Sequence, residues 1–295
     1  MPTPRAGARP DDIRSRARHT LFVEGIGEAS LDAYTCNLIL RDLKISVQPM
    51  GPAYHVKAVA QALHDNHPSY YFLIDRDHID DAAVEKSWKE FPDPASFNLL
   101  IWRRREIENY FLDPDYLAAS SYLVKSPKVL RREIASLAGK RIYLDAANLV
   151  IIRLRETLKE NWIKCFDKVN GFESKAKALE KLLSAKGLAD KAGKVAKDLG
   201  AESIEENFEQ TVNYLLGNSL RPEYGQGKWL EMVKGKEILP TVINRCFRVK
   251  GTDGKNMQGI KAVREVARDL LSQATEFQPH DFSQLYKLLK KKIAE

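Results

Sequence analysis

Short apolar runs alternate with amphipathic segments over the first 120 residues, and this alternation constrains the fold more than any other feature. Runs rich in aromatic and β-branched residues predict strands at 19–25, 45–52, 69–80 and 98–112. Apolar residues at helical spacing predict helices at 29–43 and 54–65. Strands separated by helices favour a mostly parallel sheet flanked by helices, so the predicted fold class is α/β.

The pattern changes near residue 126, after which helical spacing persists. Ser126-Pro127 is typical of a helix start, and further helices are predicted at 141–168, 174–186, 203–216, 228–247, 259–274 and 281–293. We therefore expect an N-terminal arm or helix at 1–18, a sheet-containing catalytic domain at 19–120, and a basic α-helical domain at 121–295.

The charge is distributed unevenly along the chain. Residues 1–120 carry 14 Lys and Arg against 18 Asp and Glu, whereas the remainder carries 33 against 22. This division suits an enzyme with a metal site in one part and a polyanion-binding surface in the other, although lysine-rich solvated helices give the same counts. Tyr224, Lys228, Trp229 and Lys234 interleave aromatic and basic side chains, which suits either base stacking or a helix core.

Several classes of protein are disfavoured. No apolar stretch approaches the length of a membrane span, and no apolar run follows the basic N-terminal residues, so we expect a cytoplasmic protein without a secretory signal. Cys36, Cys165 and Cys246 are far apart and lack C-x-x-C spacing, which argues against a disulfide framework or a zinc site and favours small buried side chains. No P-loop sequence is present, so ATP hydrolysis by this chain is not expected.

Acidic residues lie at or beyond the ends of three predicted strands: Glu24, the pair Asp75 and Asp77, and the pair Glu106 and Glu108. Ligands bind outside the carboxyl ends of strands in open α/β sheets, so these segments are expected to converge. If extended geometry persists, each pair points to one face. Carboxylates gathered in one cleft repel one another unless a cation lies among them, and oxygen ligands favour Mg²⁺ or Mn²⁺.

Each of these patterns has another explanation when taken alone. Glu24 before a glycine is common in solvated turns, and the D-x-D sequence also occurs in phosphatases, in glycosyltransferases and in loops capped by Asp side chains. The E-I-E-N sequence suits a helix start or ion pairs with the three preceding arginines. His78, directly after the D-x-D, is either a ligand, a proton carrier or a hydrogen-bonded neighbour.

With these acidic groups in this order on the predicted strands, the sequence resembles the TOPRIM fold, the metal-binding module of topoisomerases, primases and OLD-type nucleases. That module has a glutamate after its first strand and a D-x-D after its third, which correspond to Glu24 and to Asp75 and Asp77. The sequence RREIENYFLDPDYL is similar to OLD-like TOPRIM nucleases and to the TOPRIM effectors of PARIS anti-phage systems, and Lys234-Gly235-Lys236 is similar to a K-G-K element of the same effectors. The family often has Asp shortly after the first glycine, where this chain has Gly27 and Glu28.

The resemblance implies an Mg²⁺- or Mn²⁺-dependent endonuclease of an anti-phage system. It implies a nucleic-acid substrate (tRNA or DNA) and an ATPase partner protein that releases the nuclease. A homodimer is expected by analogy, because a helical appendage on a small α/β domain often mediates self-association, and no membrane partner is expected. The implied catalytic residues are Glu24, Asp75, Asp77, Glu106 and Lys236, and the implied metal ligands are Glu24, Asp75, Asp77, Glu106 and Glu108. Arg105 or Lys236 is expected to stabilise charge on the phosphate. A non-catalytic TOPRIM-fold binding module and a metal-dependent phosphatase with Asp75 as nucleophile remain as alternatives.

Overall fold

The computed structural model describes residues 19–27, 30–160, 186–274 and 277–294. The chain divides into two compact units, one containing residues 1–140 and 229–295, the other residues 141–228. This division differs from the predicted boundary at residue 120, because the last 67 residues belong with the sheet. The predicted arm at 1–18, most of the predicted helix at 174–186, Glu28 and Cys165 lie outside the described residues.

A four-stranded parallel sheet forms the centre of the first unit, in the order β2-β1-β3-β4. Its strands are β1 (His19–Val23), β2 (Ile45–Pro49), β3 (Tyr70–Ile74) and β4 (Leu99–Ile101). The predicted α/β class is confirmed. Val23 is in register with Pro49 on one side and with Leu73 on the other, so the carboxyl ends of these strands lie level at one edge of the sheet.

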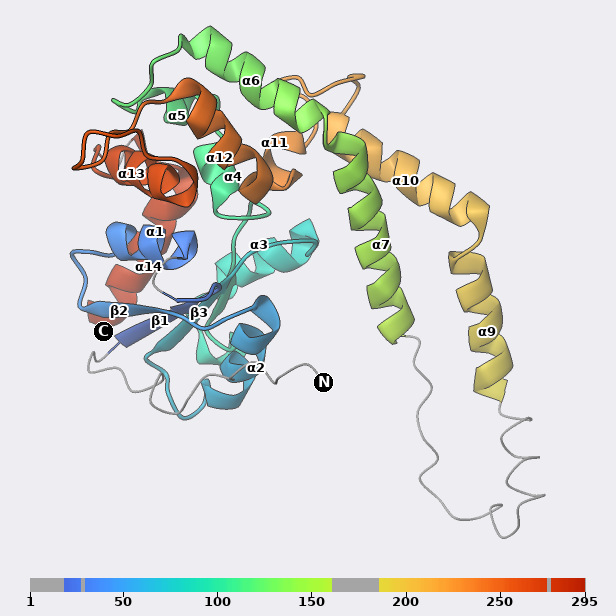
Figure 1. The fold of residues 1–295 in the computed structure, drawn as a ribbon. Helices are drawn as coiled ribbons and strands as arrows, with labels where there is room; N and C mark the ends of the chain where they lie inside the picture. The colour runs from blue at the N-terminus through green and yellow to red at the C-terminus, as the bar shows by residue number, and fades with distance from the viewer. Residues whose placement is uncertain (1–18, 28–29, 161–185, 275–276, 295) are drawn as a thin grey trace, which may run out of the picture. The chain divides into compact units, whose positions relative to one another are not determined.

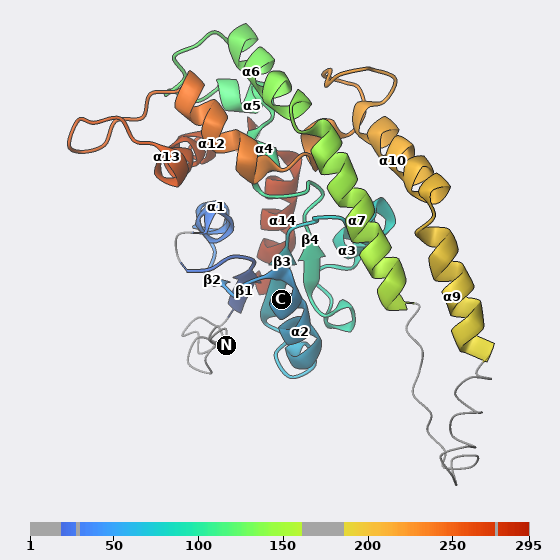
Figure 2. The same ribbon diagram turned by 45° about the vertical axis from the view of Figure 1, so that its right-hand side comes forward.

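Helices cover both faces of this sheet (Figures 1 and 2). On one face α1 (Leu31–Ile39) packs against β2 and against α14 (His280–Ala294). On the other face α2 (Ala53–Leu63) packs against β3, and α3 (Asp81–Glu90) packs against β4. Right-handed crossovers place α1 on one face of the sheet and α2 and α3 on the other. The reason is that the chain crosses the sheet in one direction from β1 to β2, and in the other direction from β2 to β3 and from β3 to β4.

Helix α3 was not predicted from the sequence. The side chain of Asp80 caps its N-terminus by accepting a hydrogen bond from Ala83 N at 2.7 Å. Val84 and Trp88, one turn apart, are buried against the sheet. The helix was missed because its mean composition is polar and only this narrow stripe is apolar.

The prediction of one strand over 98–112 was wrong in its extent. Strand β4 ends at Ile101, and the short helices α4 (Glu108–Phe111) and α5 (Pro114–Ala118) follow. After the strand, the backbone N–H groups of Arg103 and Arg104 donate to the hydroxyl of Tyr110 instead of to a neighbouring strand. Glu106 and Glu108 therefore do not alternate along a strand, because Glu108 begins a helix.

The remaining helices of this unit are α6 (Pro127–Gly139), α11 (Trp229–Met232), α12 (Gly235–Cys246) and α13 (Gly259–Leu271), with a short 3₁₀ helix η2 (Pro94–Ser96) before β4. Helix α12 packs against α4, α6 and α13. The predicted helix at 228–247 is thus two helices, α11 and α12. Trp229 is 1% exposed and belongs to the core, so it is not available for base stacking.

The second unit contains α7 (Ile142–Glu160), α9 (Lys186–Asp198) and α10 (Ala201–Leu216). Helices α7 and α10 pack together, and Arg153 Nη1 donates to Thr211 Oγ1 at 2.9 Å. Both cysteines in the described residues, Cys36 and Cys246, are buried free thiols. None of the helices in the described part of the chain combines the length and apolar character needed to span a bilayer.

Candidate active site

Glu24 directly follows β1, and the local backbone explains the V-E-G sequence. The Glu24 carboxylate accepts hydrogen bonds from the backbone N–H groups of Ala53 and Asp75, the latter at 3.3 Å. Gly25 has a φ of +120°, and a Cβ atom at this position would lie 2.2 Å from Ser30 Oγ. Because only glycine fits this turn, it fixes Glu24 at the carboxyl edge of the sheet.

Asp32 is an acidic residue near Glu24 that was not predicted from the sequence. It lies in the first turn of α1, whose N-cap residue Ser30 donates to the Glu24 carbonyl oxygen at 3.2 Å. The Asp32 side chain is 6% exposed. It shares the buried face of α1 with Thr35 and Cys36. An acid at helical spacing from small buried residues, just after the first strand, is the signal that could have identified it.

The D-x-D sequence begins where β3 ends. Asp75 is 1% exposed, whereas Asp77 is half-buried, has a φ of +50° and donates its N–H to the Arg105 carbonyl oxygen at 3.1 Å. The guanidinium of the intervening Arg76 donates to the carbonyl oxygens of Ile79 and Arg103. Arg76 therefore links this loop to the backbone that follows β4. Asp77 does not have the strand conformation that was assumed when Asp75 and Asp77 were expected to point to one face.

The E-I-E-N and K-G-K sequences lie in contact. Asn109 Oδ1 accepts from Glu106 N at 3.1 Å, and its amide nitrogen donates to two backbone carbonyl groups just before α12. A Cβ atom at Gly235 would lie 2.7 Å from Asn109 Oδ1 and 2.9 Å from Glu108 Cβ. Glycine thus permits the N-terminus of α12 to approach α4. At this N-terminus, Lys236 N donates to Glu106 Oε2 at 2.8 Å.

The ammonium of Lys236 lies among the carboxylates. Its Nζ atom is 2.8 Å from Asp75 Oδ2 and 4.0 Å from Glu106 Oε1. The Lys236 side chain is 42% exposed, whereas the carboxylates of Asp75 and Glu106 are almost fully buried. One lysine, reaching in from solvent, therefore provides the positive charge that these two buried acids contact.

The pKa values of the cluster are strongly perturbed. Burial raises the pKa of Glu108 to about 8, with the charge of Asp32 adding to the effect. Burial raises the pKa of Asp32 itself to about 6, with Lys236 opposing and Glu24 reinforcing the shift. Burial and then Asp32 hold the pKa of Asp75 well above its usual range. Burial lowers the pKa of Lys236, but the carboxylates, Asp75 first, raise it by more.

The donor atoms of this cluster suit a divalent cation. Asp75 Oδ1 and Glu108 Oε2 are buried and have no hydrogen-bond partner. Unsatisfied buried carboxylate oxygens are costly, and Mg²⁺ or Mn²⁺ prefers such ligands. Within the described ranges, no three His, Cys, Asp or Glu side chains already stand in a metal-binding arrangement. The cation in contact with Asp75 is the Lys236 ammonium.

Two other candidate residues have different surroundings from those expected. Arg105 is 6% exposed, and its Nη1 donates to the Met232 carbonyl oxygen at 3.1 Å. Its guanidinium thus contacts the backbone of α11 and is almost fully shielded from solvent. His78 is half-buried, and its Nδ1 has no hydrogen-bond partner.

No protein-family model, curated protein sequence or solved structure matches this chain. A functional assignment therefore depends on the geometry and chemistry of the carboxylate cluster itself.

Proposed function

We propose that this chain is a metal-dependent phosphodiester hydrolase that cuts nucleic acid. The observation that supports the proposal is the convergence of acids from separate parts of the chain at the carboxyl edge of a parallel sheet. The members of the cluster are Glu24, Asp32, Asp75, Glu106, Glu108 and Lys236. Such an arrangement is unfavourable for folding alone, because desolvated acids repel one another, and it is typical of sites built for chemistry.

The residues that would hold Mg²⁺ are acids at the cluster, above all those with an unpartnered carboxylate oxygen. Asp75 and Glu108 each present an unpartnered oxygen, Glu24 lies near Asp75, and Asp77 lies near Glu24. When bound, the metal would neutralise charge on the phosphate and lower the pKa of a coordinated water. Asp32 and Glu106 would hold the surrounding elements and add negative charge.

Glu24 and Lys236 have the properties of a base and an electrostatic catalyst. Burial, followed by the charge of Asp77, raises the pKa of Glu24, which brings a carboxylate closer to the range in which a general base is effective. Lys236 stays charged, and its side chain is 42% exposed, so a modest movement of this side chain would bring its ammonium to a substrate phosphate.

The nucleic-acid substrate is inferred from charge and from the TOPRIM resemblance. The chain carries a net charge of +7, and its excess of basic residues lies after residue 120. The resemblance extends the proposal to an anti-phage effector that acts on tRNA or DNA when an ATPase partner releases it. We propose that it acts in the cytoplasm as a homodimer, the latter by analogy with other helical appendages on small α/β domains.

The test is cleavage of purified tRNA, single-stranded DNA and duplex DNA in Mg²⁺ or in EDTA. Wild type is compared with Glu24→Gln and with Glu90→Gln, which removes an exposed acid of α3. We expect cutting only with Mg²⁺, loss in Glu24→Gln of at least about 100-fold, and wild-type activity in Glu90→Gln. Equal cutting in EDTA, or an unaffected Glu24→Gln, contradicts the proposal. If all preparations are inert, failure of the wild type to bind Mn²⁺ by calorimetry also contradicts it.

A non-catalytic binding module is the second candidate. The contact of 2.8 Å between Lys236 Nζ and Asp75 Oδ2 favours it, because an internal cation already compensates one buried acid. The phosphatase alternative is less favoured, since Asp75 is 1% exposed and therefore poorly placed for in-line attack. Retention of nucleic-acid binding without any divalent-cation binding would select the second candidate.

A further inference from the structure

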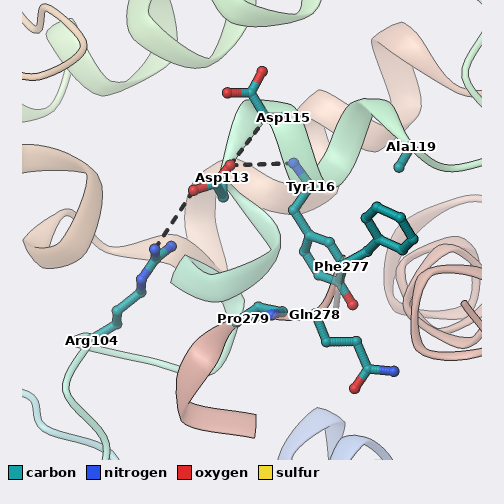
Figure 3. Close-up of a pocket in the computed structure, with 8 residues that line it drawn as sticks. All are labelled: Arg104, Asp113, Asp115, Tyr116, Ala119, Phe277, Gln278 and Pro279. Carbon is teal, nitrogen blue, oxygen red and sulfur yellow. Dashed lines mark hydrogen bonds and ion pairs between the residues drawn. The ribbon is translucent and has the colours of Figure 1, made fainter. Parts of the chain in front are cut away.

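A pocket of about 340 Å³ lies between α5 and the segment that leads into α14, and its lining includes none of the clustered acids. Figure 3 shows the residues that line it, among them Tyr116 and Phe277, and the ion pair between Arg104 and Asp113. The wall is formed by parts of the chain far apart in sequence, so the fold, and not a local motif, creates this hollow.

The pocket has one unsatisfied polar group and one exposed ring. Tyr116 is 7% exposed, yet its hydroxyl has no hydrogen-bond partner. Burial raises the pKa of Tyr116, so the group remains a neutral hydroxyl that can donate or accept. Phe277, in contrast, is 64% exposed. A ligand that covers the Phe277 ring and offers a polar edge to Tyr116 would remedy both features.

The charged residues of the wall are already compensated. Arg104 Nη2 is 3.7 Å from Asp113 Oδ2, and Arg104 Nη1 donates to the Asn109 carbonyl oxygen at 2.7 Å. Asp115 forms an ion pair with Arg131. The two carboxylates also oppose an incoming phosphate. The pocket therefore suits a neutral, planar group with hydrogen-bonding atoms at its edge.

We propose that this pocket binds an unpaired nucleobase of the substrate strand, an inference that depends on the proposed nuclease function. A nucleobase has a flat face for Phe277 and edge donors and acceptors for the Tyr116 hydroxyl. An aliphatic side chain would leave that hydroxyl buried and unsatisfied.

The pocket and the carboxylate cluster share one stretch of chain. Arg104 lies two residues before Glu106, and it binds the carbonyl oxygen of Asn109. The side chain of Asn109 in turn accepts the N–H of Glu106. A base held in the pocket would thus contact a segment of chain that also carries Glu106 of the proposed catalytic site.

The test measures binding without cleavage, by fluorescence anisotropy of the full chain in EDTA. The probes are short labelled single strands of RNA and of DNA, and an abasic strand of the same length that keeps its phosphates. We expect Phe277→Ala to weaken binding of the base-bearing strand by about fivefold or more. Tyr116→Phe, which keeps the ring, should weaken it by about two- to tenfold. Both losses should disappear with the abasic strand.

Tyr143→Ala is the matched control, because it removes another exposed aromatic ring, 56% exposed, from α7. It should leave binding unchanged, and thermal unfolding should show that all variants are folded. Equal losses with the abasic strand would mean that the pocket contacts the backbone and would overturn the inference. Unchanged binding in both pocket variants would also overturn it and favour an aromatic side chain of a protein partner. If the wild type binds no strand, the proposed function fails as well.

Discussion

Asp75 and Lys236 form the contact on which the charge balance of the cluster depends. Asp75 is 1% exposed, and the ammonium of Lys236 is 2.8 Å from its Oδ2. Removing one partner of a buried ion pair leaves the other charge uncompensated, which is more costly than the pair itself is stabilising. At the residue scale, the stability of this cluster is therefore expected to depend on keeping both partners of the pair.

Replacing Lys236 with methionine should destabilise the protein. We expect a loss of about 2 kcal/mol in the free energy of unfolding, less than for a fully buried pair because the Lys236 side chain is 42% exposed. Urea unfolding in EDTA at neutral pH measures the change, with Lys234→Met, another lysine at the start of α12, as the control. A Lys236→Met variant as stable as the control would show that the pair contributes nothing.

The buried acids predict a pH dependence of unfolding without metal. The pKa of Glu108 is raised from 4.5 to about 8, so the folded state binds this proton more tightly than the unfolded chain. The resulting stability is fully present below pH 4.5 and is lost as the pH rises to 8. Glu108→Gln should therefore be more stable than wild type at pH 8, with a flatter profile, in thermal unfolding in EDTA. A less stable variant at that pH would contradict the assignment.

At the element scale, the junction of α4 and α12 is closely packed. A Cβ atom at Gly235 would lie 2.7 Å from Asn109 Oδ1. Gly235→Ala should thus cost about 1–3 kcal/mol and weaken metal binding by displacing Lys236 and Glu106. Gly193→Ala in α9, where nothing lies within 4 Å of the added methyl, should instead be neutral or stabilising. Urea unfolding compares them, and equal effects would contradict close packing at Gly235.

The sequence was sufficient to predict the elements with long apolar runs and insufficient elsewhere. The alternation of strand and helix segments along the chain predicts four parallel strands, and the apolar runs locate β1 and β3. The extent of β4 and the break between α11 and α12 could not be predicted in this way, because they depend on side-chain contacts to the backbone, from Tyr110 to Arg103 and from Asn109 to Val233. Asp32 escaped notice for the same reason, since its burial depends on tertiary packing.

At the scale of the whole molecule, the C-terminal helices complete the core of the sheet-containing unit. Phe282 of α14 packs against Trp102, Tyr110 and Phe111, and the Tyr110 hydroxyl donates to Asp281 at 2.5 Å. Nothing local in the sequence indicates this return of the chain, which is why a boundary at residue 120 was expected.

A fragment of residues 1–140 should therefore not fold by itself. Without α14, it would expose the buried rings of Trp102 and Tyr110 to water, at a cost of several kcal/mol. Circular dichroism should show no cooperative thermal transition for the fragment, in contrast to the full chain. A sharp transition in the fragment would show that residues 229–295 are not needed for the core.

The central claim is that the buried carboxylates form a divalent-cation site, and calorimetric titration with Mn²⁺ tests it most directly. Wild type, Asp75→Asn, Glu108→Gln and the distant control Glu90→Gln are compared at neutral pH. Binding should release protons in wild type, because Glu108 has a pKa of about 8, and the measured heat should therefore change with the ionisation enthalpy of the buffer. We expect Asp75→Asn and Glu108→Gln to lose most of the binding and Glu90→Gln to retain it. Absence of binding in wild type, or equal binding in all four proteins, would contradict the account.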